Sequence, residues 1–522
     1  MNLSPARKFV LAFAFGLLAV FGFAPFALFP LVILALTALF WLWLQAASTR
    51  EAVWLGFVFG MGLLCGGVGW IYVALHDYGD MNFVLALIGT ALFCAVNAAL
   101  PALAGYVQAK IHAPVWARMA LVMPASWALM EWLRGLLFTG FPWLAVGYSQ
   151  VPTSPLAGYA PVFGVFGVSL IVAISAGLLL LLQQGRWSVP GKAALATLLL
   201  LWAGGAMLRT VQWTQAEGEP IKVALLQGNI PQELKFREDK LVNTLETYRR
   251  LIEGSDARLI VLPETALPLL RSELPESYTT LLRDHARQNG GDLLIGAFEH
   301  DDGRYYNSVI TLGTADNQSY RKNHLVPFGE FIPLRPVLGW LITSVLNIPM
   351  SDMARGGEHQ PLLRVAGQRV AIAICYEDVF GEELIRYLPE ASLLVNVSND
   401  AWYGHSHAAM QHNQIAQMRA LESGRMMLRA TNTGVTSIIG RDGVIQKILP
   451  QHEEGILTGP VQGYSGSTPY VRWGNAAVLA LLVLILALAW KLRIPSPSGL
   501  RKGGGKAAGY PPASLLRGRG PR

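Results

Sequence analysis

Apolar residues are distributed very unevenly along the 522-residue chain, and this distribution constrains the fold more than any other feature. Residues 1–208 are almost all long apolar runs, residues 219–468 carry charged side chains throughout, and another apolar run covers 475–490. Only 14% of the residues are charged, whereas soluble proteins have about a quarter. The pattern predicts a helical membrane bundle and a globular domain of roughly 250 residues, long enough to bury its own core.

The apolar runs are sufficient for about eight membrane spans. A transmembrane helix needs about 20 mostly apolar residues. The candidate spans are 9–24, 28–46, 53–75, 83–107, 119–138, 160–183, 193–208 and 475–491. The chain is therefore predicted to comprise a bundle of about seven spans at 1–215, a globular domain at 219–468, a C-terminal span at 474–492 and a basic tail at 493–522.

Basic residues in the short loops predict the orientation of the bundle, because such loops stay in the cytoplasm. They precede the first span and occupy every second loop: Arg7, Lys8, Arg50, Lys110, Arg118, Arg186 and Lys192. The alternate loops at 76–82 and 139–159 contain neither Lys nor Arg. Both termini are therefore expected in the cytoplasm, with the globular domain on the other side of a multi-pass membrane protein.

The net charge of +7 does not indicate a nucleic-acid partner. From Lys491 onward the tail holds eight Lys and Arg residues and no acid, so the remainder of the chain is close to neutral. Such a tail is typical of a cytoplasmic extension, and a basic binding face for nucleic acid is not expected.

The globular domain alternates short β-branched runs with helical stretches, which is typical of a layered α/β fold. Three segments carry reactive groups: "VLPET" ends at Glu264, "YRKNHLVPFGE" contains Lys322 and Glu330, and "AICYED" contains Cys375. A cysteine nucleophile needs a base, since a thiol near pKa 8.5 is mostly protonated at neutral pH. A carboxylate can take that proton, and a lysine can stabilise a thiolate and an oxyanion. Taken singly, each of these groups is more often structural.

In this order, "LPET", "RKNHLVPFGEFIP" and "CYED" resemble the nitrilase, or carbon–nitrogen hydrolase, superfamily with its Glu–Lys–Cys triad. With "EWLRG" at 131–135 and "GFPWLAVGYSQ" at 140–150, the chain more closely resembles the apolipoprotein N-acyltransferase family, over essentially residues 5–490. The resemblance implies that the globular domain is a four-layer αββα sandwich. It also implies a bacterial inner membrane, with this domain on the periplasmic side.

The resemblance assigns roles to the three reactive residues. Glu264 would be the general base, Lys322 the partner of the thiolate and the oxyanion, and Cys375 the nucleophile. The implied reaction is a two-step acyl transfer, in which Cys375 takes the sn-1 acyl chain of a phospholipid as a thioester. The α-amino group of an apolipoprotein's diacylglyceryl-cysteine then accepts it. The implied partners are this donor, this acceptor and the bilayer, with no cofactor and no metal.

Further residues follow from the same resemblance. Glu330 and Glu377 match functional carboxylates of the family, and the main-chain N–H of Tyr376 would help to bind the oxyanion. Phe236 stands where the family commonly has Trp, so packing against an acyl chain is expected without an indole N–H.

The charge-free segment 336–351 lies inside the globular domain and is too short to span the membrane comfortably. It is either part of the core or a lid that dips into the membrane interface. As a lid, its Trp340 would seal the pocket together with Phe236 and Trp402.

The segment "HSHAAMQH" holds three histidines, His405, His407 and His412. Their spacing fits none of the common zinc patterns, so a metal site is not expected. We expect these side chains to shape the wall of the pocket near Asn399 and Trp402.

Two other functions remain open from the residues alone. One is a membrane-tethered amidase or nitrilase that releases its acyl group to water. The other is a transporter or scaffold with an inactive domain, although the spans lack most of the charged pairs that line ion pathways. The exceptions are Glu131 and Arg134 near the outer end of the fifth span, which could pair with each other or contact lipid headgroups.

Overall fold

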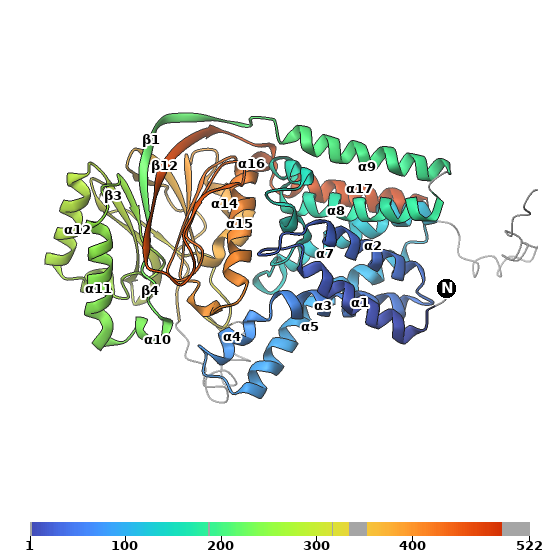
Figure 1. Cartoon of the computed structure of the whole chain (residues 1–522), viewed down its shortest axis with the longest axis horizontal. Helices are drawn as coiled ribbons and strands as arrows, with labels where there is room; N and C mark the ends of the chain where they lie inside the picture. The colour runs from blue at the N-terminus through green and yellow to red at the C-terminus, as the bar shows by residue number, and fades with distance from the viewer. Residues whose placement is uncertain (1–2, 186–187, 316, 333–351, 493–522) are drawn as a thin grey trace, which may run out of the picture.

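The computed structural model of the protein describes residues 3–185, 188–315, 317–332 and 352–492. Within these ranges, a bundle of helices lies beside a domain built of two β-sheets (Figure 1). Two long strands connect the two parts, because β1 (Thr214–Gln227) follows the bundle and β12 (Gly455–Gly466) leads back into it. These strands pair antiparallel from Thr214 opposite Gly466 onward, so both connections run side by side.

Every predicted span coincides with helical structure. The bundle helices are α1 (Pro5–Val20), α2 (Pro30–Leu44), α3 (Thr49–Gly67), α4 (Trp70–His76), α5 (Phe83–Lys110), α6 (Val115–Ala117), the π-helix η1 (Arg118–Val122), α7 (Met123–Arg134), α8 (Ala160–Gly185), α9 (Val189–Leu208), α16 (Pro469–Trp473) and α17 (Ala476–Lys491).

Length and hydropathy support fewer spans than the eight predicted. Three helical segments of the described chain are long and apolar enough to cross a membrane, Phe83–Lys110, Pro155–Gln183 and Val189–Leu208. The pair α3 and α4 adds a fourth if this pair, bent by 59°, is one span. The helices α2 and α17 are apolar but have only 15 and 16 residues, so helix length by itself does not confirm the predicted number.

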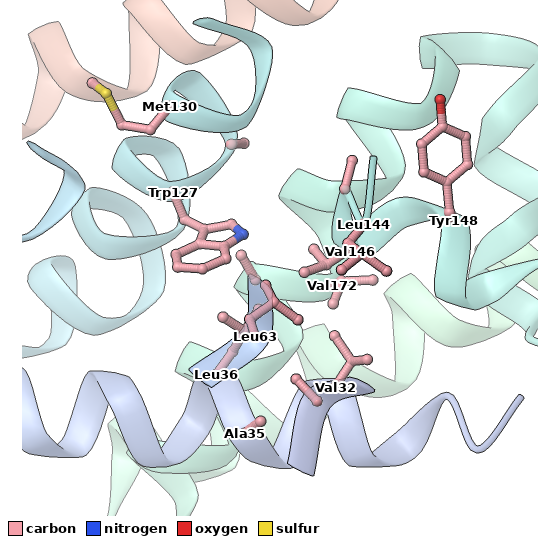
Figure 2. Packing of buried hydrophobic residues seen from close by; sticks show 14 of the residues in the cluster. Val32, Ala35, Leu36, Leu63, Trp127, Met130, Leu144, Val146, Tyr148 and Val172 are labelled. Atoms are coloured by element: carbon pink, nitrogen blue, oxygen red, sulfur yellow. The ribbon is translucent and has the colours of Figure 1, made fainter. Parts of the chain in front are cut away.

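Small residues allow the bundle helices to pack closely. A Cβ on Gly16 of α1 would lie 2.2 Å from the Phe59 carbonyl oxygen of α3, and one on Gly62 would lie 2.3 Å from the Phe13 oxygen. Helices in lipid approach through such small residues, because packing drives their association there. Figure 2 shows larger side chains filling the adjoining core, among them Trp127, Leu63, Leu36, Val146 and Val172.

In its described residues, the globular domain contains two six-stranded sheets. The first has the order β12-β1-β2-β3-β4-β5 and the second β11-β10-β9-β8-β7-β6. Pairs β1–β2, β2–β3, β7–β8 and β8–β9 are parallel, and the other pairs are antiparallel. The remaining strands are β2 (Leu259–Val261), β3 (Asp292–Asp301), β4 (Arg304–Gly313), β5 (Ser319–Arg321), β6 (Leu363–Val365), β7 (Gln368–Ile374), β8 (Leu393–Ser398), β9 (Met427–Thr431), β10 (Ser437–Ile439) and β11 (Ile445–Ile448).

The predicted αββα sandwich is confirmed. Alternate apolar residues of both sheets form one buried layer between them, including Val223 and Val261 from the first sheet and Ile372 and Val395 from the second. Helices α11 (Glu238–Glu253) and α12 (Glu276–Gln288) cover the outer face of the first sheet. Helices α14 (Gly381–Leu384) and α15 (Ala408–Ser423) cover the second sheet. Almost all of α15 is buried, because it lies between the second sheet and the bundle.

Candidate active site

Glu264 follows β2 in the first sheet and is 8% exposed. Asn307 Nδ2 donates to its Oε1 at 2.7 Å, and the main-chain N–H of Asn399 donates to its Oε2 at 3.0 Å. Burial by itself would raise the pKa of Glu264. The positive charges of Lys322 and Lys235, together with these hydrogen bonds, outweigh burial and lower that pKa below its ordinary value. Glu264 is therefore an ionised carboxylate at neutral pH.

Lys322 follows β5 and is 1% exposed. Its Nζ donates to Glu330 Oε1 at 2.9 Å and to Glu264 Oε1 at 3.4 Å. Burial disfavours the charged ammonium, but the two carboxylates outweigh burial and raise the pKa of Lys322. The lysine thus remains a cation, held between two carboxylates.

Cys375 begins the turn that follows β7. Its φ of 54° lies in the left-handed region, which is uncommon for residues other than glycine and concentrates at functional sites. Burial and then the Glu264 charge raise the pKa of the thiol well above its ordinary value, whereas Lys322 lowers it. The thiol is therefore protonated at rest and needs a base. Lys322 pairs with Glu264 at 3.4 Å, and the charges of both residues act on the pKa of the Cys375 thiol.

Glu377 joins two segments of this site. Its Oε1 accepts the main-chain N–H groups of Asn323 at 2.6 Å and His324 at 3.0 Å, and its Oε2 accepts that of Ile374 at 2.7 Å. The hydroxyl of Tyr320 lies 3.1 Å from both oxygens. The carboxylate therefore ties the turn after β5 to the end of β7, which positions the lysine and the cysteine relative to each other.

Substituting Glu377→Gln replaces one of these acceptor oxygens by an NH₂ group that faces a main-chain N–H. We expect alkylation of Cys375 by iodoacetamide to slow by at least about tenfold, equivalent to about 1.4 kcal/mol, because one of the two tied segments is released. Mass spectrometry of the peptide that contains Cys375 measures this rate.

The matched control is Glu383→Gln, because Glu383 contacts the side-chain ring of His324 at 2.8 Å, whereas Glu377 accepts the main-chain N–H of the same residue. Equal alkylation rates in the Glu377→Gln variant and the wild type would show that Glu377 does not position the nucleophile.

The residue after the nucleophile rests on the membrane bundle. The Tyr376 hydroxyl donates to the Gly140 carbonyl oxygen at 3.0 Å, and its ring stacks with Phe141 and Trp143. Trp143 Nε1 in turn donates to Gln411 Oε1 of α15 at 2.7 Å. The loop at 140–150 is therefore a structural part of the site.

Glu131 and Arg134 hold this same loop. Glu131 accepts the Trp127 indole N–H at 2.9 Å and the Val146 main-chain N–H at 3.0 Å, and an Arg134 Nη donates to the Trp143 carbonyl at 2.6 Å. They are only 4% and 5% exposed, so the suggested contact with lipid headgroups is wrong.

His412 does not form part of the pocket wall, contrary to the sequence-based expectation. Its ring is completely buried between Asp378 Oδ1 at 2.8 Å and Asp400 Oδ1 at 3.1 Å. Arg429 bonds the other oxygens of the two aspartates at 3.3 and 2.7 Å. Buried charges are stable only when they are paired and hydrogen-bonded, and this requirement explains the position of the histidine.

Two of the residues expected to contact substrate are exposed aromatic side chains. Phe236 is 57% exposed with its ring 6.4 Å from that of Phe298, and Trp402 is 43% exposed with its ring 6.1 Å from that of Tyr78. Trp340, with the whole of the predicted lid at 336–351, lies outside the described residues.

Comparisons with known proteins show which family the chain belongs to. Residues 15–178 match the model of the apolipoprotein N-acyltransferase N-terminal domain, and residues 222–470 match that of carbon–nitrogen hydrolases. A curated apolipoprotein N-acyltransferase from Nitrosomonas europaea is 52% identical over 482 residues, which cover 92% of this chain and 96% of the relative. The corresponding protein of Methylococcus capsulatus is 44% identical over 495 residues, covering 93% and 96%. The chain belongs to the apolipoprotein N-acyltransferase family.

Membership makes the chain an acyltransferase, which excludes the transporter or scaffold alternative. Among solved structures, a CN-hydrolase superfamily protein from Xanthomonas campestris matches with a TM-score of 0.36 and 16% identity, over 51% of this chain and 97% of that one.

Two residues of the site in this family member were missed by the sequence-based predictions. Asn307 lies in β4 and bonds the side chains of both Glu264 and Glu330. Lys235 is 3% exposed, and its Nζ donates to the Glu264 carbonyl oxygen at 3.0 Å. Neither belongs to a reactive motif, although Lys235 directly precedes Phe236 in the segment "QGNIPQELKF".

Proposed function

We propose that the chain transfers an acyl chain from the sn-1 position of a phospholipid to the α-amino group of an apolipoprotein's N-terminal diacylglyceryl-cysteine. The observation that carries this proposal is the position of Cys375. Glu264 and Lys322 are coupled to it, and the next residue is hydrogen-bonded to the membrane bundle. A nucleophile in this place is close to lipid substrates on one side and to an exported peptide on the other.

In the first step, the Cys375 sulfur attacks the ester carbonyl and its proton passes to Glu264. Lys322 and the Tyr376 main-chain N–H are the proposed stabilisers of the oxyanion. The carbon–oxygen bond then breaks, Glu264 returns the proton to the departing lysophospholipid oxygen, and a thioester remains on Cys375. Glu330 keeps Lys322 in place during this step, since it bonds the same ammonium group.

In the second step, the acceptor's neutral amine attacks the thioester carbonyl. The nitrogen loses a proton to Glu264, the carbon–sulfur bond breaks, and Glu264 returns the proton to the Cys375 sulfur. An amide on the acceptor and a free thiol result. Two moderate barriers replace one high barrier, which is the advantage of covalent catalysis.

We propose about eight spans, with both termini in the cytoplasm of a bacterium and the sandwich domain in the periplasm. The N-terminus lies at the end of the bundle far from the sandwich (Figure 1). Lys8, in the first turn of α1, is close to this end, which supports a cytoplasmic position for it. The proposed parts are 1–215, 219–468 and 474–492, with a tail at 493–522.

Reporter fusions test this topology. A phosphatase that is active only outside the cytoplasm should be active when fused after residue 220 or 465, and inactive when fused after residue 495. A reporter active only in the cytoplasm, fused at the same positions, is the control and should show the opposite pattern. Activity of the phosphatase at 495 would contradict the orientation.

The reaction itself is tested with purified protein, phospholipid and a diacylated lipopeptide that has a free N-terminal amine. We expect one lysophospholipid and one N-acylated lipopeptide for each acyl chain consumed. Free fatty acid as the main product would instead indicate the membrane-tethered hydrolase.

A further inference from the structure

A second lysine lies against the proposed base. Lys235 ends the short helix α10 (Gln232–Lys235) and is 3% exposed. Its Nζ donates to the carbonyl oxygen of Glu264 at 3.0 Å, and no carboxylate oxygen lies within salt-bridge distance of it in the described part of the chain. Glu233, on the same helix, is exposed. The cost of burying an ammonium group is large unless nearby charges compensate it.

The compensating charges belong to the site. The charge of Glu264 and then that of Cys375 act on Lys235, and both favour its charged form. Burial acts in the opposite direction and is the larger effect, so the pKa of Lys235 falls to about 8. Lys235 is therefore mostly a cation at neutral pH, although its pKa is lower than that of Lys322.

The charge of Lys235 changes the net charge of the group formed by Glu264, Glu330 and Lys322. Two carboxylates, Glu264 and Glu330, face the ammonium group of Lys322, which bonds both of them. With Lys322 alone the group has one excess negative charge, and Lys235 neutralises it. Moving the proton from the Cys375 thiol to Glu264 keeps this total unchanged. A neutral site therefore holds the ionised base and the thiolate at a lower cost than a negative one.

We propose that Lys235 is a positioning residue of the acyl-transfer site, which holds the main chain of Glu264 and keeps both this carboxylate and the Cys375 thiolate accessible in their ionised forms. Lys322 cannot by itself stabilise both the Glu264 carboxylate and the Cys375 thiolate, because Glu264 and Glu330 already share its single positive charge. The proposal deepens the proposed function and rests on it only for the role of Glu264 as the base.

The test measures the alkylation of Cys375 by iodoacetamide as a function of pH, in full-length protein in detergent. In the Lys235→Met variant we expect the midpoint of the profile to move to higher pH by about one unit, which is about tenfold in rate at a fixed pH below it. The Lys235→Arg variant retains the charge and the donors, so it should restore the wild-type midpoint. Lys240→Met is the matched control, since Lys240 is an exposed lysine of α11.

Two results would overturn the proposal. One is a wild-type profile in Lys235→Met. The other is a rate that falls by the same factor at every pH, which would mean that Lys235 only supports packing. Thermal unfolding of each variant identifies loss of structure, and the midpoint shift is independent of the amount of folded protein.

Alkylation of Cys375 requires no lipid, so this assay tests the effect of Lys235 on the thiol independently of whether the protein transfers acyl chains. In the acyl-transfer assay, Lys235→Met should form the acyl adduct about tenfold more slowly at pH 7 than the wild type. If the wild type formed no adduct while the alkylation midpoint still moved, the proposed function would fail and the charge effect of Lys235 would stand.

Discussion

Wild-type protein incubated with phospholipid is expected to carry one acyl group on Cys375, and the Cys375→Ala variant is expected to carry none. Intact-mass measurement followed by peptide mapping shows both the mass and the position of the group. Cys65 and Cys94 provide an internal control, because both are free cysteines in the bundle helices and should remain unmodified.

Glu264→Gln should slow formation of the adduct by about a hundredfold to ten-thousandfold, the usual contribution of a positioned base. The amide keeps the shape of the side chain, but it cannot take the proton of a thiol whose pKa is raised by burial. Full acylation of this variant would mean that another group is the base, and Glu330 would be examined first.

Lys322→Met should also prevent acylation, for a different reason. Without the ammonium group, the buried carboxylate of Glu264 and the partly buried one of Glu330 both face Asn307, and their repulsion favours protonation of one of them. Acylation is therefore measured per folded molecule, and the surface substitution Lys222→Met provides the comparison.

The acyl-enzyme is expected to persist for hours in phospholipid alone and to disappear after addition of a diacylated lipopeptide with a free N-terminal amine. A transferase must exclude water from the thioester until the amine arrives, and apolar surroundings suppress hydrolysis of such an intermediate. Phe236 and Trp402 are exposed aromatic side chains, and we expect them to cover the thioester. Time-resolved intact mass, with the released lysophospholipid and lipopeptide quantified, follows both stages.

The matched control is the same lipopeptide with an acetylated amine, which should leave the acyl-enzyme unchanged. Rapid turnover to free fatty acid without any amine would contradict the transferase reaction and support the hydrolase alternative. Collapse of the thioester with the acetylated peptide would show that the acceptor's amine is not the nucleophile.

The length of the apolar runs does not determine how many helices cross the membrane. The apolar runs correctly predicted where the helices lie, because a run of about 20 apolar residues is stable only in lipid or in a core. They did not determine how many helices cross the membrane, since α1 contains Arg7 and Lys8 and has only 16 residues. Contacts such as that of Lys8 with Glu51 on α3 depend on the packing of separate helices.

Glu264 and Cys375 could be predicted because each follows a recognisable strand, and Lys322 because it belongs to the motif "RKNHLVPFGEFIP". The short strand β5 before Lys322 was not predicted. That Lys322 bonds both Glu264 and Glu330 is consistent with this prediction. Their roles in catalysis remain proposals until the variants above are measured. Alternating strands and helices predicted a layered α/β domain, and the four-layer sandwich was an expectation from the family resemblance.

By itself, then, the sequence determined the helical bundle and a layered α/β domain, because local periodicity is set by neighbouring residues. The resemblance of its motifs to a known family pointed to the αββα sandwich and to the reactive residues. Only the tertiary structure decided which distant groups meet. It brought Lys235 to Glu264 across 29 positions and Tyr376 to Gly140 across 236. It also enclosed His412 between two aspartates. A buried polar group needs a hydrogen-bond partner, and that partner can come from any part of the fold. A local sequence pattern therefore does not predict it.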